Sequence, residues 1–200
     1  LHTLSHYPHP NVRELVAKHN NTHQDTLHKL SDDPEFDVRY AVANNNNTHQ
    51  DTLHKLSDDP HLSVRELVAS NKNTRKDTLH KLSDDDKWRV RELVASHNNT
   101  HQDTLHKLSD DPDVRWRVAI HKNTHQDTLH KLSDHTDSLN TWQVRELVAL
   151  NNNTHQDTLH KLSSDPDKDV RFRVASNNNT HKDTLHKLSD HTDPLNTVSV

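Results

Sequence analysis

Residues 21–32 read NTHQDTLHKLSD, and this string decides the fold class because it returns almost unchanged along the whole chain. Its copies begin at Asn21, Asn47, Asn73, Asn99, Asn123, Asn153 and Asn179. A second motif, Val-Arg-x-x-Val-Ala, accompanies it and begins at Val12, Val38, Val64, Val90, Val114, Val144 and Val170. The spacing is 26 residues apart from one short and one long interval. Such a period is typical of a stacked tandem-repeat array, in which each unit contacts only its neighbours.

The repeated string predicts a first helix of about two and a half turns. Thr22 suits the N-cap, and Asp25 lies three positions on, as in a capping box whose acid also favours the positive end of the helix. Leu27 and Leu30 give an apolar stripe, with His23 placed between them on the same face.

The Val-Arg motif predicts a second helix in each repeat. The pair at 33–34, Asp-Pro, supplies a cap followed by proline at the first helical position. Val38, Ala41 and Val42 then share one face, and the helix is expected to end near Ala43. The asparagine-rich residues 44–47 make the return turn.

The composition favours an elongated array over a compact globule. Only 28% of the residues are hydrophobic and 4% aromatic, so the helical spacing of the few apolar residues has to specify the fold. The absence of cysteine excludes disulfides and thiolate metal sites. No apolar run is long enough to span a bilayer, and no signal segment is evident, which leaves the compartment undecided.

The domain expectation is a single array over residues 1–200. It has a partial repeat at 1–20 and repeats starting near 21, 47, 73, 99, 123, 153 and 179. The residues Leu1 to Leu4 align with Leu27 to Leu30, and Asp190 opens a connection like the one after Asp134. Without evident caps, the ends are expected to belong to a longer array or to stack on other copies.

Two constant residues have expected structural roles. The last turn asparagine, Asn21 and its equivalents, suits a ladder in which its side chain bonds the neighbouring turn. The arginine of the second motif is expected to pair with a capping aspartate of the adjacent unit. A phosphate-binding stripe is the alternative for this row, which consists of Arg13, Arg39, Arg65, Arg91, Arg115, Arg145 and Arg171.

The combination Val-Arg-x-x-Val-Ala, Asn-x-Asn-Thr and Leu-x-x-Leu-x-x-Asp resembles the leucine-rich repeat variant family, relatives of HEAT-type helical solenoids. The resemblance covers nearly all of the chain. It implies an all-α, right-handed α-solenoid of about seven 26-residue repeats, each with two short α or 3₁₀ helices. The family's iron-sulfur cluster is not carried over, because the chain has no cysteine.

Histidine is the compositional outlier, with 22 residues in 200. One row follows the turn threonine, and a second row lies inside the first helix, mostly with an aspartate four residues on. This spacing could hold zinc or another divalent metal if a neighbouring unit or chain completed the site. A solvated face with a simple His/Asp contact is the other interpretation. The candidate ligands are His28, Asp32, His54, Asp58, His80, Asp84, His106, Asp110, His130, Asp134, His160, His186 and Asp190.

The aromatic residues of the second helix vary among repeats, unlike the constant first helix. They are either substitutes in the core packing or contacts for a protein partner. These candidate contact residues are Phe36, Tyr40, Trp88, Trp116, Trp142 and Phe172.

The function expected from the sequence is a non-enzymatic scaffold for protein–protein interaction or for self-assembly into a filament, with no cofactor. A histidine-rich metal array and a binding module for one soluble partner are the alternatives. Catalysis is disfavoured because His28, Ser31 and Asp32 lie on one short repeated helix. Nucleic-acid binding is disfavoured by the net charge of −5. Protonation of the histidines predicts a response between about pH 7 and 5.

Overall fold

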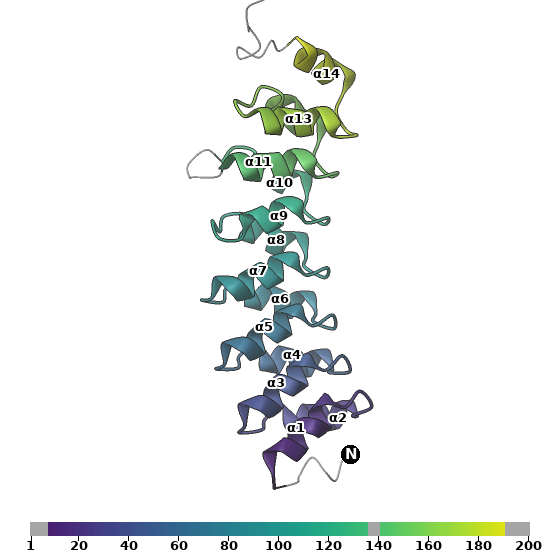
Figure 1. The fold of residues 1–200 in the computed structure, drawn as a ribbon, viewed down its shortest axis with the longest axis vertical. Helices are drawn as coiled ribbons and strands as arrows, with labels where there is room; N and C mark the ends of the chain where they lie inside the picture. The colour runs from purple at the N-terminus through teal and green to yellow at the C-terminus, as the bar shows by residue number, and fades with distance from the viewer. Residues whose placement is uncertain (1–7, 136–140, 191–200) are drawn as a thin grey trace, which may run out of the picture. The chain divides into compact units, whose positions relative to one another are not determined.

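The computed structural model describes residues 8–135 and 141–190. This part of the chain contains fourteen α-helices and neither a strand nor a 3₁₀ helix (Figure 1). The expected all-α fold of two-helix repeats is confirmed. The chain separates into two compact units, Leu1–Thr104 and Leu105–Val200, which are described one at a time. The single array over residues 1–200 stays a prediction.

Unit 1 contains four second helices and the three first helices between them, and α8 begins at its end. The second helices are α1 (Pro10–Lys18), α3 (Phe36–Asn44), α5 (Leu62–Ser70) and α7 (Trp88–Ser96). The first helices are α2 (Gln24–Leu30), α4 (Gln50–Leu56), α6 (Lys76–Leu82) and α8 (Gln102–Leu108).

Unit 2 repeats the same alternation. Its second helices are α9 (Arg115–Ile120), α11 (Thr141–Leu150) and α13 (Lys168–Ser176). Its first helices are α10 (Gln126–Leu132), α12 (Gln156–Leu162) and α14 (Lys182–Ser189). The short helix α9 follows the short interval of the sequence, where two residues are missing before Val114.

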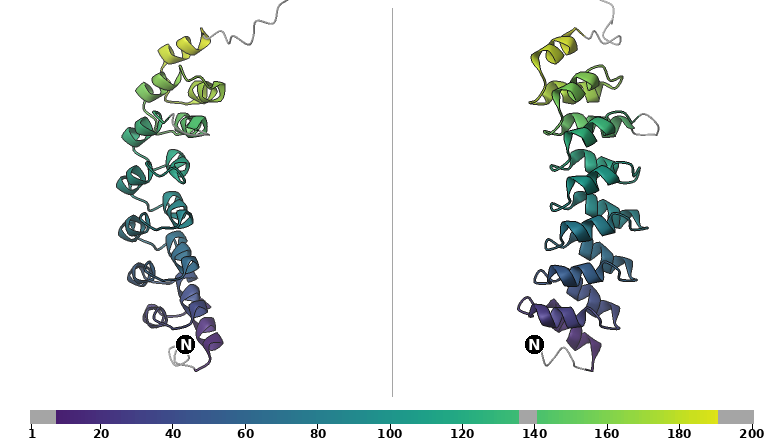
Figure 2. Two further views of the ribbon diagram at one scale, coloured as in Figure 1. Left: turned by 90° about the vertical axis from the view of Figure 1, so that its left-hand side faces the viewer. Right: turned by 180° about the vertical axis from the view of Figure 1, so that it is seen from behind.

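Each unit has two layers, one of first helices and one of second helices (Figure 2). Within each unit, successive second helices pack directly on one another. The first helices α2, α4, α6, α10 and α12 pack against the second helices before and after them, and α14 packs against α13. The core lies between the layers. Leu27 and Leu30 from the first helix and Val38 and Val42 from the second are all at most 3% exposed. A buried side chain of this kind contributes about 1.5–3 kcal/mol.

Some expectations fall outside the described residues. These are the alignment of Leu1 to Leu4 with a first helix, the end of the chain at Val200, and the connection within residues 136–140 and beyond Asp190.

The expected start of the first helix is wrong. Helix α2 begins at Gln24, and its N-cap is His23, whose Nδ1 accepts a hydrogen bond from the Asp25 backbone N–H at 3.3 Å. His23 is exposed and does not join the apolar stripe. The Thr22 hydroxyl instead donates to the Val16 carbonyl at 2.5 Å. The same carbonyl also accepts from the backbone N–H of the C-cap residue His19 at 3.2 Å, so Thr22 adds a second hydrogen bond at the end of α1.

The expected start of the second helix is also wrong. Helix α3 begins at Phe36, with Glu35 as its N-cap. Asp33 lies before the helix, where its Oδ1 accepts from the Glu35 backbone N–H at 3.0 Å and closes an Asx turn. The Asp33 carboxylate also binds Arg13, so a contact with the preceding repeat holds this turn outside the helix.

Candidate interaction surface

The arginine of the second motif forms an ion pair with the aspartate at the end of the next first helix. Arg39 Nε lies 2.6 Å from Asp59 Oδ2, and Nη2 lies 3.3 Å from the other carboxylate oxygen. Arg39 also donates to the backbone carbonyls of Asp33 and Pro34, at 2.9 and 3.0 Å. Equivalent pairs are Arg13–Asp33, Arg65–Asp85 and Arg145–Asp165. The expected pairing is confirmed, and these guanidinium groups face carboxylates, which leaves little of them for a phosphate ligand.

The ion pairs change the pKa values of Asp33 and Arg39. Burial alone would raise the pKa of the Asp33 carboxyl, but hydrogen bonds from Arg13 and from the Glu35 backbone outweigh it and lower that pKa. The hydrogen bond to Asp59 raises the pKa of Arg39. The partners are therefore charged near neutral pH and hold adjacent repeats together.

The structure contains two asparagine ladders, of which the sequence predicted one. In the predicted ladder, the Asn47 amide donates to the Thr22 carbonyl of the preceding turn at 2.8 Å. In the second ladder, the buried Asn45 amide donates to the Ala17 carbonyl at 2.6 Å, and its oxygen accepts from the Asn47 backbone at 2.8 Å. The signal for this second ladder is a position directly after the second helix that alternates only between asparagine and histidine.

Histidine can replace asparagine in the second ladder. His97 Nε2 lies 3.0 Å from the Asn71 carbonyl, and Nδ1 lies 3.1 Å from the Asn99 backbone N–H. A carbonyl only accepts and an amide N–H only donates, so this imidazole is neutral, with its proton on Nε2. Burial lowers the pKa of His97, and the hydrogen bond to Asn71 opposes that effect only in part.

The histidine row inside the first helix contacts the next repeat. His28 Nδ1 lies 2.9 Å from the Thr52 hydroxyl. The same contact joins His54–Thr78, His80–Thr104, His106–Thr128, His130–Thr158 and His160–Thr184. The aspartate four residues on pairs with a lysine of the next repeat, as in Asp32–Lys55, Asp58–Lys81, Asp110–Lys131 and Asp134–Lys161.

These contacts give the candidate metal ligands other partners. Over residues 8–135 and 141–190, no three histidine or acidic side chains gather into a group that could hold a metal ion. The metal-binding array remains a prediction from the sequence, and its site would need ligands from another chain.

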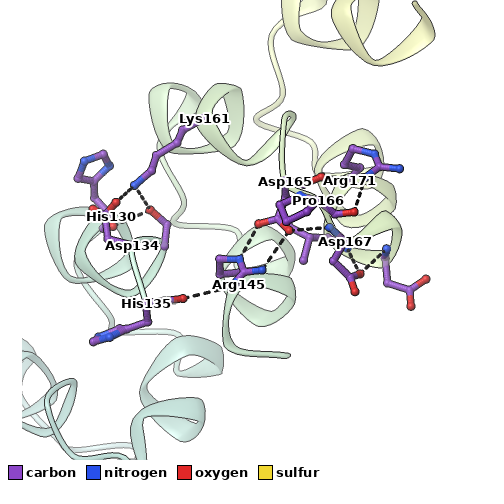
Figure 3. Close-up of polar contacts among 12 residues, drawn as sticks. His130, Asp134, His135, Arg145, Lys161, Asp165, Pro166, Asp167 and Arg171 are labelled. Carbon is purple, nitrogen blue, oxygen red and sulfur yellow. Dashed lines mark hydrogen bonds and ion pairs between the residues drawn. The ribbon is translucent and has the colours of Figure 1, made fainter. Parts of the chain in front are cut away.

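Among the residues that the structure describes, one arginine of the second motif has a histidine in place of the pairing aspartate. Arg115 Nη1 donates to the Nδ1 atom of His135 at 3.0 Å. A guanidinium only donates, so this nitrogen must be unprotonated. The His135 carbonyl accepts from Arg145 at 3.1 Å, and Arg145 also pairs with Asp165 at 2.6 Å (Figure 3). At this position the arginine therefore faces an uncharged imidazole in place of a carboxylate.

Three of the six candidate contact residues are half-buried. The Phe36 ring lies 3.8 Å from the ring of His61 in the next repeat, centroid to centroid. The Arg117 guanidinium lies 3.9 Å from the centroid of Trp116. Trp142 is half-buried at the start of α11. These rings are partly covered by the chain and partly open to solvent.

The other three candidates are exposed: Tyr40 by 36%, Trp88 by 49% and Phe172 by 63%. Leu15, Ile120 and Leu150, which the sequence analysis did not single out, are exposed on second helices too. Within the described chain, Leu185 in α14 is the one large hydrophobic residue exposed elsewhere. We call the exposed side chains of the second helices, within each unit, the second-helix face. It is the candidate interaction surface.

None of the helices in the described chain has the length and hydropathy needed to cross a membrane.

Comparison with known proteins agrees with the repeat pattern. The model of the family described as leucine rich repeat variant matches residues 88–113 and 142–167. A solved leucine-rich repeat variant, described as having a novel repetitive structural motif, is 26% identical to this chain with a TM-score of 0.64. The alignment covers 86% of this chain and 68% of that one.

Other solved helical repeat proteins are more loosely similar. A designed armadillo repeat protein in complex with the peptide (KR)4 is 17% identical over 94% of this chain and 97% of its own, with a TM-score of 0.42. A chain of the Pds5–Scc1 complex is 16% identical over 96% of this chain and 38% of its own, also with a TM-score of 0.42. No curated protein matches the sequence.

Proposed function

Because this chain is built from helical repeats of which two match the leucine-rich repeat variant family, we propose that it is a non-enzymatic scaffold that binds protein through its second-helix face. The carrying observation is that six of the seven large hydrophobic residues exposed in the described chain lie on second helices. An apolar surface concentrated on one layer is typical of an interaction site.

The first-helix layer has the opposite character. Its constant side chains hold neighbouring repeats together, as His28 does with Thr52 and Lys55 with Asp32. The Ser31 hydroxyl donates to the His28 carbonyl at 2.6 Å, so the residues that superficially resemble a catalytic triad have separate structural partners. This supports a scaffold and not an enzyme.

The exposed aromatic residues are suitable anchors. A partner that covered Tyr40 and Trp88 on unit 1, or Phe172 on unit 2, would remove large rings from water, and aromatic residues dominate the energetics of many protein interfaces. Because these positions differ among repeats, the aromatic anchors would lie on some repeats and not on others. The side chains of the second helices vary among repeats and those of the first helices are nearly constant. This fits a scaffold that contacts its partner through the second helices only.

The chain supplies replacements that its fold already accepts. Glutamate occupies the Tyr40 and Phe172 position in four other repeats, at Glu14, Glu66, Glu92 and Glu146. Lysine occupies the Trp88 position at Lys168. A triple variant, Tyr40→Glu, Trp88→Lys and Phe172→Glu, should therefore fold like the parent while losing the aromatic anchors.

The test is photo-cross-linking in the cells that make the protein. A photoreactive amino acid at Glu66, which is half-buried in α5 at the position equivalent to Tyr40, should give a protein adduct, and the same group at His54 on the first-helix layer should not. The triple variant should lose the adduct. Equal adducts from both layers, or an adduct unchanged in the triple variant, would contradict the proposal.

A second copy of the chain is one partner that this proposal includes, because self-assembly is a form of protein binding. Sedimentation velocity of the purified chain distinguishes it. Concentration-dependent association that the triple variant abolishes would identify the partner as the chain itself. A monomer that still forms the cellular adduct would identify a different protein.

A further inference from the structure

A pocket lies between the carboxyl-terminal ends of α9 and α11 and the turns that follow them. Its lining residues are Ile120, Lys122, Leu147, Leu150 and the turn at 151–153. Ile120 is 41% and Leu150 49% exposed, so the aliphatic surface is open to solvent. The turn beneath is fixed, because the Asn153 amide donates to the Lys122 carbonyl at 2.6 Å.

Unit 1 has an equivalent pocket with a different chemistry. It is lined by Ser70, Lys72, Leu93, Ser96 and the residues 97–99. Serines therefore stand where unit 2 has isoleucine and leucine. The same fold position is polar in one repeat and aliphatic in another, so repeat packing does not require the aliphatic side chains. They are substitutions confined to this part of the surface.

The pocket in unit 2 has a cation at its edge. Lys122 is exposed and forms no ion pair with any residue that the structure describes. Most other repeats carry asparagine at this turn position, namely Asn20, Asn46, Asn98, Asn152 and Asn178. Glu146, which precedes the lining residue Leu147 in the sequence, is paired with Arg173 at 2.8 Å. The pocket therefore combines aliphatic surface with one uncompensated positive charge.

We infer that this pocket docks a short acidic segment of a protein partner, carrying one aliphatic side chain. The aliphatic side chain would contact Ile120, Leu147 and Leu150, and a neighbouring carboxylate would pair with Lys122. A basic segment would meet repulsion from Lys122 instead. The inference rests on the proposed scaffold function and specifies the chemistry of one segment that the scaffold accepts.

Ile120 is the only isoleucine in the chain, and this makes the pocket directly observable. Labelling isoleucine with ¹³C in the δ1 methyl group gives a single NMR signal, which needs no assignment. The probe is the capped peptide Asp-Glu-Leu-Glu-Asp, titrated into the full-length protein. We expect a saturable shift of the Ile120 methyl signal. Control peptides replace the leucine by serine or all the acids by lysine, and neither should give a saturable shift.

Two variants use residues that other repeats already contain. Leu150→Ser reproduces Ser96 of unit 1 and should weaken the peptide about tenfold, as expected for losing roughly half of a buried leucine contact. Lys122→Asn reproduces the other turns and should weaken it about two- to fivefold, as expected for one exposed ion pair. The matched control, Lys72→Asn in the polar pocket, should leave the Ile120 titration unchanged.

Absence of a saturable shift, equal binding of the lysine peptide, or unchanged affinity in Lys122→Asn would each overturn the inference. Such a result would leave the proposed function intact as long as the cross-link at Glu66 still depends on the aromatic residues. If the cross-link at Glu66 did not depend on the aromatic residues but the peptide titration were as expected, the proposed binding through the aromatic residues would be wrong and the inferred peptide pocket would stand.

Discussion

Replacement of Asn71 by alanine should destabilise the chain strongly, because this side chain joins two repeats. Its amide donates to the carbonyls of Ala43 and Asn45, at 2.8 and 3.2 Å. Its oxygen accepts from the Asn73 backbone N–H at 3.0 Å. The residue is only 7% exposed, so water does not readily replace these bonds.

The expected loss is about 2–5 kcal/mol. Each of the three hydrogen bonds contributes about 0.5–1.5 kcal/mol, and a buried group left without a partner costs about 1–3 kcal/mol. The range allows for partial relaxation of the turn. Asn71→His is the matched control, because His97 makes the contacts equivalent to those with the Asn45 carbonyl and the Asn73 backbone N–H one repeat later. It should lose less than about 1 kcal/mol when the imidazole is neutral.

The assay is urea unfolding followed by circular dichroism, at about pH 8, where histidine is neutral. Because repeat arrays depart from two-state unfolding, hydrogen exchange at the Asn73 amide should accompany it. Asn71→Ala should lower the midpoint and speed exchange at this amide. A loss below about 0.5 kcal/mol, or equal losses in the alanine and histidine variants, would refute the reasoning.

Three further predictions follow from the same contacts. Arg39→Ala should lower the free energy of unfolding, measured with urea, by about 3–5 kcal/mol, because it leaves the buried Asp59 carboxylate without its arginine partner. The pKa of Asp33 is lowered in the folded chain, so its carboxylate stabilises the fold above the unfolded-state pKa of about 4, and this stabilisation is lost as the pH falls through the folded-state pKa. In the variant Asp33→Asn, the melting temperature should therefore depend less on pH between about pH 5 and 3. The pKa of His97 is also lowered, so its contribution is present above about pH 6.5 and lost at lower pH. His97→Asn should be less acid-sensitive than the parent in urea unfolding at about pH 5.5, and an unchanged acid sensitivity would contradict this assignment.

The contacts that the sequence predicted are those between constant residues with one obvious partner type. The pairing of Arg39 with Asp59 and the bond from Asn47 to the preceding turn are of this kind. Regular spacing brings such residues into register once the repeat is recognised. The two-helix fold follows from the same regularity.

The contacts that the sequence did not predict depend on which long-range partner a side chain prefers. Thr22 and Asp33 are both good local caps, but Thr22 bonds the Val16 carbonyl of the preceding helix, and Asp33 binds Arg13 of the preceding repeat in addition to its local bond with Glu35. The contact of His28 with Thr52 spans 24 residues and needs the packing of the first helices to be known. The pocket at Ile120 was missed because a residue at a helix end can face either the core or the solvent.

The constant contacts have a consequence for how the array changes length. Each repeat offers an arginine to the repeat after it and an asparagine to the repeat before it, as Arg39 does with Asp59 and Asn71 with Ala43, and it receives the matching groups from the opposite sides. Copying or deleting a whole unit in the gene therefore creates no new kind of junction. Within the described chain, the junction of Arg115 with His135 departs from this rule, since it joins a guanidinium to an imidazole. Copies made from other units extend the array without a compensating mutation, and this unit is the poorest template for duplication.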